Sequence, residues 1–234
     1  MKLYVDTADL GEARRAAELG FVDGITTNPS LVARQRTALE PLVRELAAIL
    51  DGDVWCQVVS ADAPAMVAEA RAMHGWAANV VVKLPMSLEG LRAAARLADT
   101  GVRTNMTLVY SVPQALLAAK AGVAWISPYV GRMEDTGISG ANVIGEMVDA
   151  LAAQGLPTRV LVASVRGPRH LAQLARHGVG GFTMPLEVLL GLVGHPMTDR
   201  GQEQFLADWE RAVFDGRSQG ATEATTDQTG RVDA

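Results

Sequence analysis

The sequence is poor in cysteine and in aromatic residues: it has one cysteine, Cys56, and aromatics make up 5% of its 234 residues. A single cysteine excludes an intramolecular disulfide. No apolar run reaches the roughly 20 residues that a membrane-spanning helix needs, and the first residues read as a strand and not as a signal peptide. We therefore expect a cytoplasmic protein that has no membrane partner.

An excess of basic residues is also absent. Lysine and arginine number 21 and the acidic residues 26, which gives a formal net charge of −5 at pH 7. The charges are interspersed along the chain, without the basic patch that nucleic-acid binding requires. We expect no nucleic acid among the partners and instead a small, freely diffusing molecule.

Two kinds of ligand-binding motif are missing as well. There is no glycine-rich loop of the GxGxxG or GxxxxGK type, which argues against a nucleotide-binding doubly wound sheet. No His/Cys/carboxylate group has metal-ligand spacing. The four histidines fall in segments that read as helix or loop: His74, His170, His177 and His195. We expect no metal and no cofactor.

What the chain does have is a regular alternation of short β-branched runs with longer Ala/Leu/Arg-rich segments of helical periodicity. The expected strands are residues 2–6, 22–27, 53–60, 79–85, 103–110, 124–130, 159–164 and 181–185. The helical segments between them include residues 42–50, 63–75, 88–99, 112–122, 141–154 and 168–178. Eight such units without a linker predict a single α/β domain, a (β/α)8 TIM barrel.

The end of the chain differs in composition. Residues 203–216 read as an additional amphipathic helix, so the barrel with its C-terminal helix is predicted to span residues 1–216. Residues 217–234 are polar and predict a flexible tail.

Lys83 is an unexpected residue, because it follows three valines in the sequence NVVVKLP. An ammonium in an apolar interior costs several kcal/mol unless it is paired or neutral. Since side chains alternate along a strand, Lys83 shares a face with Val81, and the apolar set of Val80, Val82 and Leu84 packs under the helices. Lys83 is therefore predicted to point into the barrel.

The same alternation places further polar residues on the inner face, near the carboxyl ends of the strands where barrels keep their active sites. They are Asp6, Thr26, Asn28, Gln57, Asn105, Thr107, Ser127, Tyr129 and Ser164. Each has an ordinary structural alternative: Lys83 can extend to solvent, Asp6 can cap a helix, and the amides can be satisfied core groups. Their convergence at one face favours an aldolase-like site.

Six segments in chain order resemble the short form of the transaldolase family, which includes the fructose-6-phosphate aldolases. They are VDTAD (5–9), GITTNPS (24–30), VVKLPMSLEGL (81–91), TNMTLVYS (104–111), ISPYVGR (126–132) and ASVRGPRH (163–170). The resemblance extends through nearly the whole chain. It implies a (β/α)8 fold and a class I, metal-free mechanism through a lysine Schiff base.

The resemblance also implies a role for each residue of the site. Lys83 would form the Schiff base with the ketone of the donor sugar, and Asp6 would handle the proton of the hydroxyl at the bond being broken. Asn28 and Ser127 would bind the primary hydroxyl of the dihydroxyacetone portion. The other assignments are a proton-shuttling water held by Thr107 and Gln57, and a phosphate site formed by Arg132, Ser164 and Arg166. Thr26 and Asn105 are further substrate-binding candidates.

Two positions carry the residues of the fructose-6-phosphate aldolases: Gln57, where transaldolases usually have glutamate, and Tyr129, where they have phenylalanine. Asn105 and Ser127 look more like transaldolases. A tyrosine hydroxyl beside the catalytic water favours protonation of the three-carbon enamine and release of dihydroxyacetone. We therefore expect a fructose-6-phosphate aldolase. The alternatives are a transaldolase of the pentose phosphate pathway, a non-catalytic sugar-phosphate-binding barrel and a structural protein.

The resemblance implies a homo-oligomer, with pentamers or decamers typical of the short forms. The C-terminal helical segment carries apolar residues at helical spacing: Phe205, Leu206, Trp209, Val213 and Phe214. Such a stripe needs a covering surface, either a neighbouring subunit or the chain's own barrel.

Overall fold

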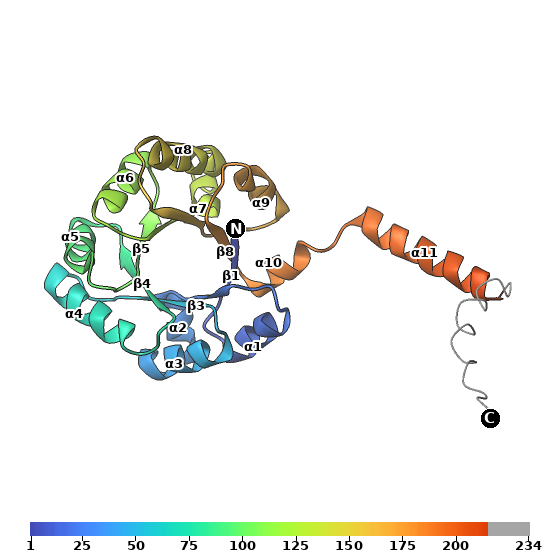
Figure 1. The fold of residues 1–234 in the computed structure, drawn as a ribbon, viewed down its shortest axis with the longest axis horizontal. Coiled ribbons are helices and arrows are strands. Elements are labelled where there is room, and N and C mark those ends of the chain that lie inside the picture. The colour runs from blue at the N-terminus through green and yellow to red at the C-terminus, as the bar shows by residue number, and fades with distance from the viewer. Residues whose placement is uncertain (215–234) are drawn as a thin grey trace, which may run out of the picture. The chain divides into compact units, whose positions relative to one another are not determined.

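The computed structural model describes residues 1–214, and its strands form a closed barrel in chain order, β1 to β8 (Figure 1). Every neighbouring pair is parallel, and β8 closes the barrel by pairing Phe182 with Leu3 of β1. Helices surround the strands (Figure 1). The prediction of a (β/α)8 TIM barrel is confirmed. An open sheet is excluded, because β1 and β8 pair with each other and leave no edge strand.

The strands are β1 (Lys2–Asp6), β2 (Gly24–Thr26), β3 (Asp53–Gln57), β4 (Val80–Pro85), β5 (Thr104–Val109), β6 (Trp125–Pro128), β7 (Arg159–Val162) and β8 (Gly181–Met184). The helices are α1 (Leu10–Glu18), α2 (Pro29–Gln35), α3 (Leu39–Ile49), α4 (Ala63–His74), α5 (Leu88–Leu97), α6 (Val112–Lys120), α7 (Val130–Glu134), α8 (Gly140–Ala153), α9 (Pro168–Ala175), α10 (Leu186–Gly191) and α11 (Pro196–Phe214).

Local sequence explains where the helices begin. The side chains of Asp9, Asp62, Ser87 and Ser111 each cap a helix by accepting a hydrogen bond from the backbone N–H three residues later. Such a cap contributes about 1 kcal/mol, because it satisfies a backbone donor that has no partner within the helix. Asp9, and not Asp6, caps α1, so Asp6 is free of the ordinary structural role considered for it.

The alternation of side chains divides the core into two parts. Outward-facing residues such as Val80, Val82 and Leu84 pack under the helices. A separate inner cluster fills the barrel itself, and it consists of Tyr4, Trp55, Val81, Trp125 and Leu161. The Trp55 ring meets Tyr4 and Trp125 edge to face, with centroid distances of 5.3 and 5.4 Å. We call this inner cluster the aromatic floor. It lies below Lys83, because Val81, which belongs to it, precedes Lys83 by two residues on the inner face of β4.

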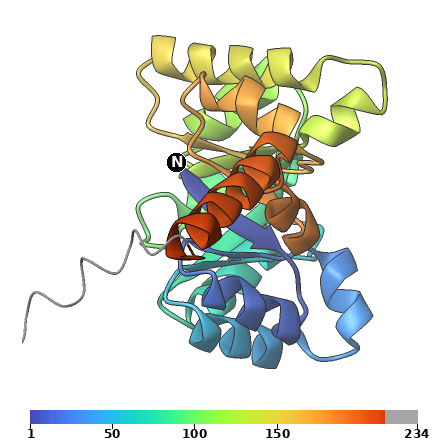
Figure 2. The same ribbon diagram turned by 90° about the vertical axis from the view of Figure 1, so that its right-hand side faces the viewer.

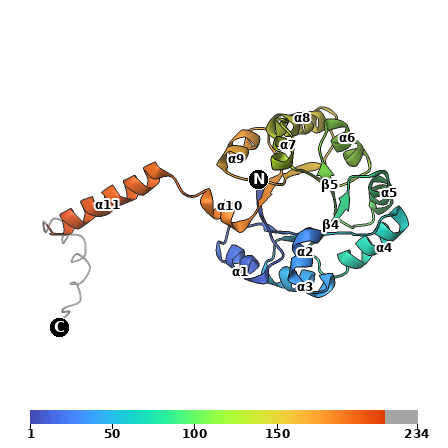
Figure 3. The ribbon, with the colours of Figure 1, turned by 180° about the vertical axis from the view of Figure 1, so that it is seen from behind.

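Two of the shorter helices mark the end of the barrel at which the strands finish. α2 follows β2, α7 follows β6, and both stand at the end toward which β1 points (Figure 2). Figure 3 views the barrel from that end. The loops that contain α2 and α7 therefore border the opening where the predicted site residues gather.

The chain divides into two compact units, Met1–Leu192 and a second that begins at Val193. The second unit contains α11, which confirms the predicted C-terminal helix. Phe205, Leu206 and Trp209 on this helix are 75%, 59% and 63% exposed. The predicted tail, residues 217–234, lies outside the described residues. None of the helices in residues 1–214 has the length and apolar character needed to cross a membrane.

Candidate active site

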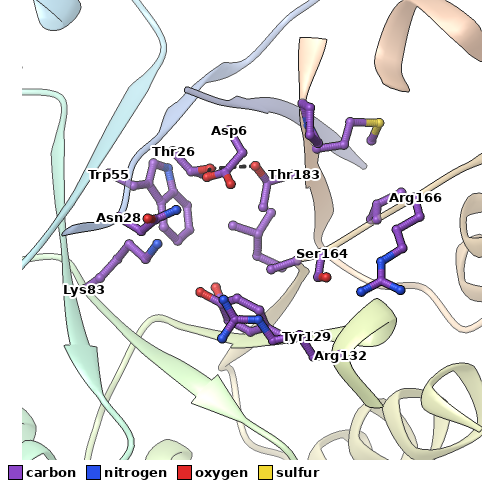
Figure 4. Close-up of a pocket in the computed structure, with 16 residues that line it drawn as sticks. Asp6, Thr26, Asn28, Trp55, Lys83, Tyr129, Arg132, Ser164, Arg166 and Thr183 are labelled. Atoms are coloured by element: carbon purple, nitrogen blue, oxygen red, sulfur yellow. Dashed lines mark hydrogen bonds between the residues drawn. The ribbon is translucent and has the colours of Figure 1, made fainter. Parts of the chain in front are cut away.

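A cavity of about 250 Å³ opens at the carboxyl ends of the strands (Figure 4). Nine of the predicted site residues line it: Asp6, Thr26, Asn28, Lys83, Ser127, Tyr129, Arg132, Ser164 and Arg166. They come from β1, β2, β4, β6 and the segments that follow β2, β6 and β7. The barrel thus brings together residues that are far apart in the sequence.

Lys83 is a buried lysine that lines this cavity, with 5% of its surface exposed. Its Nζ donates a hydrogen bond of 2.6 Å to the backbone carbonyl oxygen of Thr27. The side chain lies above Val81 of the aromatic floor and does not extend to solvent. A buried primary amine that faces a cavity is suited to nucleophilic attack on a carbonyl carbon.

Asp6 ends β1, and its carboxylate accepts a 2.7 Å hydrogen bond from Thr26 Oγ1. The Thr26 oxygen also lies 2.6 Å from Thr183 Oγ1. Because the Thr26 proton is directed to the carboxylate, the Thr183 hydroxyl donates to Thr26. Burial raises the pKa of Asp6 above its ordinary value, while Lys83, the Thr26 hydrogen bond and Arg132 act in the opposite direction. A carboxylate with a raised pKa is a stronger base than an ordinary one, so Asp6 is suited to accepting a proton.

Ser127, which lines the cavity, forms a buried pair with Asn105, which does not. Ser127 Oγ donates to Asn105 Oδ1 at 2.9 Å, and both residues are almost fully buried. Within residues 1–214, Asn105 Nδ2 has no hydrogen-bond partner. Asn105 itself does not line the cavity, so it orients the Ser127 hydroxyl from behind.

Asn28 both caps a helix and lines the cavity. Its Oδ1 accepts from the backbone N–H of Leu31 and thereby caps α2. The residue also lines the cavity beside Lys83 (Figure 4). Because the cap uses only the oxygen, the side-chain NH₂ can donate to a ligand.

Thr107 lies in β5 and Tyr129 directly follows β6, and their hydroxyl oxygens are 3.1 Å apart. The guanidinium carbon of Arg132 lies 4.7 Å from the centre of the Tyr129 ring, which holds the ring from its face. A bulge in β5 shifts the register between Thr107 and Val109, and Leu108 within it has a φ of 62°. Bulges are common next to active sites, and this one follows Thr107, whose inward direction comes from regular alternation with Asn105.

Gln57 is placed differently from the other predicted residues. Its Cα pairs in register with Lys83, but its side chain lines a neighbouring hollow together with Thr27, Asn28 and Pro29. The structure therefore brings Thr107 to Tyr129 and does not bring Gln57 into the same cavity. The suggested water between Gln57 and Thr107 stays a prediction.

Arg132, Ser164 and Arg166 gather at the outer part of the cavity. Gly131 permits this approach, since a Cβ there would lie 2.6 Å from the Ser164 carbonyl oxygen and 2.6 Å from Arg166 Nε. Ser164 has a φ of 60°, an uncommon conformation for a residue with a side chain. Two guanidinium groups and a hydroxyl form a site that suits a phosphate.

Thr183 and Trp55 are among the cavity residues that the sequence prediction did not include. Thr183 completes the hydroxyl chain to Asp6, and the Trp55 side chain forms part of the cavity floor. Trp55 shares a face with Gln57, and the apolar pair Phe182 and Met184 places Thr183 inward. The alternation of side chains along β3 and β8 therefore predicts that both residues point inward.

Comparison with known proteins agrees with this arrangement. Residues 3–229 match the family described as Transaldolase/Fructose-6-phosphate aldolase. The chain belongs to this family. Membership makes the protein an aldolase or transaldolase of carbohydrate metabolism, with sugar phosphates as its substrate class.

The family members most similar to the chain include three named probable transaldolase. The one from Desulfotalea psychrophila is 48% identical over 90% of this chain and 99% of its own length. Those from Shouchella clausii and Desulforudis audaxviator are 44% and 48% identical over 90% of this chain and 98% of theirs. These names do not separate transfer of the three-carbon unit from its release.

Solved structures show the same fold at low identity. A phosphonomutase described as putative, from Burkholderia cenocepacia, has a TM-score of 0.59 at 15% identity and covers 92% of each chain. A mandelate oxidase variant has a TM-score of 0.58 at 18% identity and covers 79% of this chain and 65% of its own. At this level of identity the likeness concerns the barrel architecture alone.

Proposed function

We propose that this family member is a class I aldolase that cleaves and forms fructose 6-phosphate, with dihydroxyacetone and glyceraldehyde 3-phosphate as the other reactants. The observation that carries the proposal is the presence of a buried amine and a partly buried carboxyl group in one cavity. Lys83 and Asp6 line the same space below a mouth that contains Arg132. A binding protein without catalysis has no need of a buried lysine in this position.

The first step uses Lys83. Its neutral amine attacks the C2 ketone of fructose 6-phosphate to form a carbinolamine. The carbinolamine then takes up one proton from solvent and loses water, which leaves a protonated Schiff base. The Schiff-base nitrogen then serves as the electron sink for the bond cleavage, so the proposed route needs no cofactor. Thr27 supports this step because its carbonyl oxygen, 2.6 Å from Nζ, orients the amine.

The second step uses Asp6. The ionised carboxylate takes the proton of the C4 hydroxyl while the C3–C4 bond breaks. The electron pair of that bond moves toward the Schiff-base nitrogen and forms the enamine of the three-carbon unit. Glyceraldehyde 3-phosphate is the aldehyde that leaves. Thr26 and Thr183 keep the carboxylate oriented through their hydrogen bonds.

The remaining residues position the two ends of the substrate. Asn28 and Ser127 would bind the primary hydroxyl of the dihydroxyacetone portion. Arg132, Ser164 and Arg166 would bind the phosphate, since guanidinium groups match phosphate oxygens in geometry and charge. Binding both ends holds the C3–C4 bond between Lys83 and Asp6.

The fate of the enamine separates an aldolase from a transaldolase. Release requires that C3 be protonated and that water then hydrolyse the Schiff base. The Tyr129 hydroxyl, 3.1 Å from Thr107 Oγ1, supports release because two hydroxyl groups together can hold and polarise a water molecule.

Transaldolase activity is the second candidate, and two observations favour it. Ser127 donates to Asn105, a pair that resembles the transaldolases. Relatives that are 48% and 44% identical to the chain are named probable transaldolase. In this reaction the enamine stays unprotonated until an acceptor aldehyde such as erythrose 4-phosphate arrives.

One assay distinguishes these activities. Fructose 6-phosphate is supplied alone and then with erythrose 4-phosphate, and both free dihydroxyacetone and the transfer product are measured. An aldolase releases dihydroxyacetone at a similar rate in both cases. Product formation that depends on the acceptor supports the transaldolase, and no reaction in either case refutes both.

A further inference from the structure

Arg166 is held by an acidic residue in the structure. Its two terminal nitrogens each donate to one oxygen of Asp135, both at 2.6 Å. In Figure 4 the guanidinium group is turned toward the helix that carries Arg132 and not toward the middle of the cavity. Asp135 directly follows α7. The carboxylate thus occupies the same two donors that a phosphate would use.

A second contact holds the backbone of Arg166. The N–H of Arg166 donates to His170 Nδ1 at 3.2 Å, and His170 Nε2 lies 2.9 Å from Glu134 Oε2. Because Nδ1 accepts a hydrogen bond, the ring proton is on Nε2 and is donated to Glu134. His170 is 6% exposed, so this chain of contacts is buried at its centre.

We propose that Glu134 and Asp135 position Arg166 for the phosphate of the sugar substrate, Glu134 through His170 and Asp135 as a counter-ion that the phosphate displaces. The inference rests on the proposed function, in which Arg166 receives that phosphate. It assigns Glu134 and His170 as positioning residues and Asp135 as a counter-ion that occupies Arg166 until phosphate binds. All three act through Arg166 and do not touch the substrate.

The two contacts differ in how easily they break. The side chains of Arg166 and Asp135 are 51% and 54% exposed, and an exposed ion pair contributes little to stability. A phosphate dianion can therefore take the place of Asp135 on the guanidinium group. The buried imidazole of His170 stays bound to the Arg166 backbone during this exchange and keeps the loop in place.

This arrangement predicts effects of opposite sign. Asp135→Asn removes a competing negative charge, so inorganic phosphate should bind about two- to fivefold more tightly. His170→Ala removes the support of the Arg166 backbone, so phosphate should bind about three- to tenfold more weakly. His170→Asn keeps an acceptor near the Nδ1 position and should recover part of the affinity.

The test is calorimetric titration of the full chain with inorganic phosphate at fixed pH and low salt. Asp149→Asn is the matched control, since it removes the same charge from an exposed position on α8. Glu134→Gln weakens the same support at a partly exposed site, which covers the case in which His170→Ala does not fold. Michaelis constants for phosphorylated and unphosphorylated glyceraldehyde provide a second readout, and only the first should change.

The results separate the inference from the proposed function, because phosphate binding needs no catalytic step. If Asp135→Asn binds phosphate no more tightly than Asp149→Asn does, or if the His170 and Glu134 variants bind like the wild type, the positioning role is refuted. The Schiff base is tested independently by borohydride trapping on Lys83. A wild-type protein that binds no phosphate would overturn both this inference and the proposed phosphate site, while trapping would still decide the chemistry.

Discussion

The hydroxyl oxygens of Tyr129 and Thr107 lie 3.1 Å apart where β5 and β6 end. Arg132 lies against the face of the Tyr129 ring, and Thr107 pairs in register with Ser127 of β6. Tyr129 lines the cavity, and Thr107 contacts it from the neighbouring strand. This relationship is the structural basis for distinguishing release of the three-carbon unit from its transfer.

Tyr129→Phe removes one hydroxyl and leaves the ring in place. We expect release of dihydroxyacetone from fructose 6-phosphate to slow by about a hundredfold, because one catalytic hydrogen bond is lost. Transfer to erythrose 4-phosphate should change much less, since it requires no protonation of the enamine. The ratio of the two rates is the quantity to measure.

Gln57→Glu added to Tyr129→Phe should shift the ratio further toward transfer, because it restores the residue that transaldolases usually have. Gln57→Glu alone is the control, and it also tests whether the side chain turns into the cavity during the reaction. An unchanged ratio in the single and double variants would show that Tyr129 only fills space.

Asp6→Asn should inactivate the enzyme and stabilise it at the same time. Asparagine keeps an oxygen that accepts the Thr26 hydrogen bond, but it cannot take a proton from the substrate. Loss of a general base reduces turnover by about a hundredfold or more. The variant should unfold at a higher temperature than the wild type at pH 8, because it lacks the buried charge.

The dependence of this effect on pH follows from the direction of the Asp6 shift. Its pKa in the folded protein lies above the ordinary value of 3.8. Below pH 3.8 both states are protonated and the burial of charge has no effect; as the pH rises through the folded pKa, the native state carries the full penalty. The gain in melting temperature should therefore appear with rising pH. A gain that is largest in acid would contradict this account.

Gly131→Ala tests the tight packing at the phosphate site. A Cβ at 2.6 Å from the Ser164 carbonyl oxygen forces the segment carrying Ser164 and Arg166 to move. We expect a loss of about 1–3 kcal/mol in the free energy of unfolding and weaker binding of phosphorylated aldehydes. Gly167→Ala is the control, because a Cβ there meets no heavy atom within 4 Å. Equal effects in both variants would argue against the packing explanation.

The subunit count is a separate prediction. Phe205, Leu206 and Trp209 lie at helical spacing on α11, and such an apolar stripe needs a covering surface, either a neighbouring subunit or the chain's own barrel. We expect a ring-forming homo-oligomer, a pentamer or decamer, in light-scattering measurements at micromolar concentration. Replacing Trp209 and Phe205 by serine should reduce the measured mass. A wild-type monomer would refute the prediction.

Much of the fold was predictable because its signals are local. The alternation of apolar residues gave all eight strands and the inward direction of Lys83. The boundaries were less accurate, and residues 53–60 were expected where β3 is Asp53–Gln57. The strand endings depend on contacts with neighbouring strands and loops, and Ser164, expected within a strand, has a φ of 60°. Such conformations are set by tertiary contacts.

The site was predictable as a set of residues and less so as a set of contacts. Nine of the twelve predicted residues line the cavity. Strand alternation predicted the inward direction of those on or next to the strands, such as Lys83, and the family resemblance supplied Arg132 and Arg166. The position of Gln57 depends on a side-chain rotation that periodicity does not encode. The pairing of Arg166 with Asp135 joins segments 31 residues apart, which no local pattern reveals.

The central claim is that Lys83 forms a covalent Schiff base, and borohydride reduction in the presence of dihydroxyacetone tests it most directly. The other lysines are Lys2 and Lys120, and neither lines the cavity. Peptide mapping by mass spectrometry should show one reduced three-carbon adduct, on Lys83, and none in a Lys83→Ala variant, which should also lose turnover. An unmodified Lys83, or a Lys83→Ala variant that keeps its activity, would contradict the account.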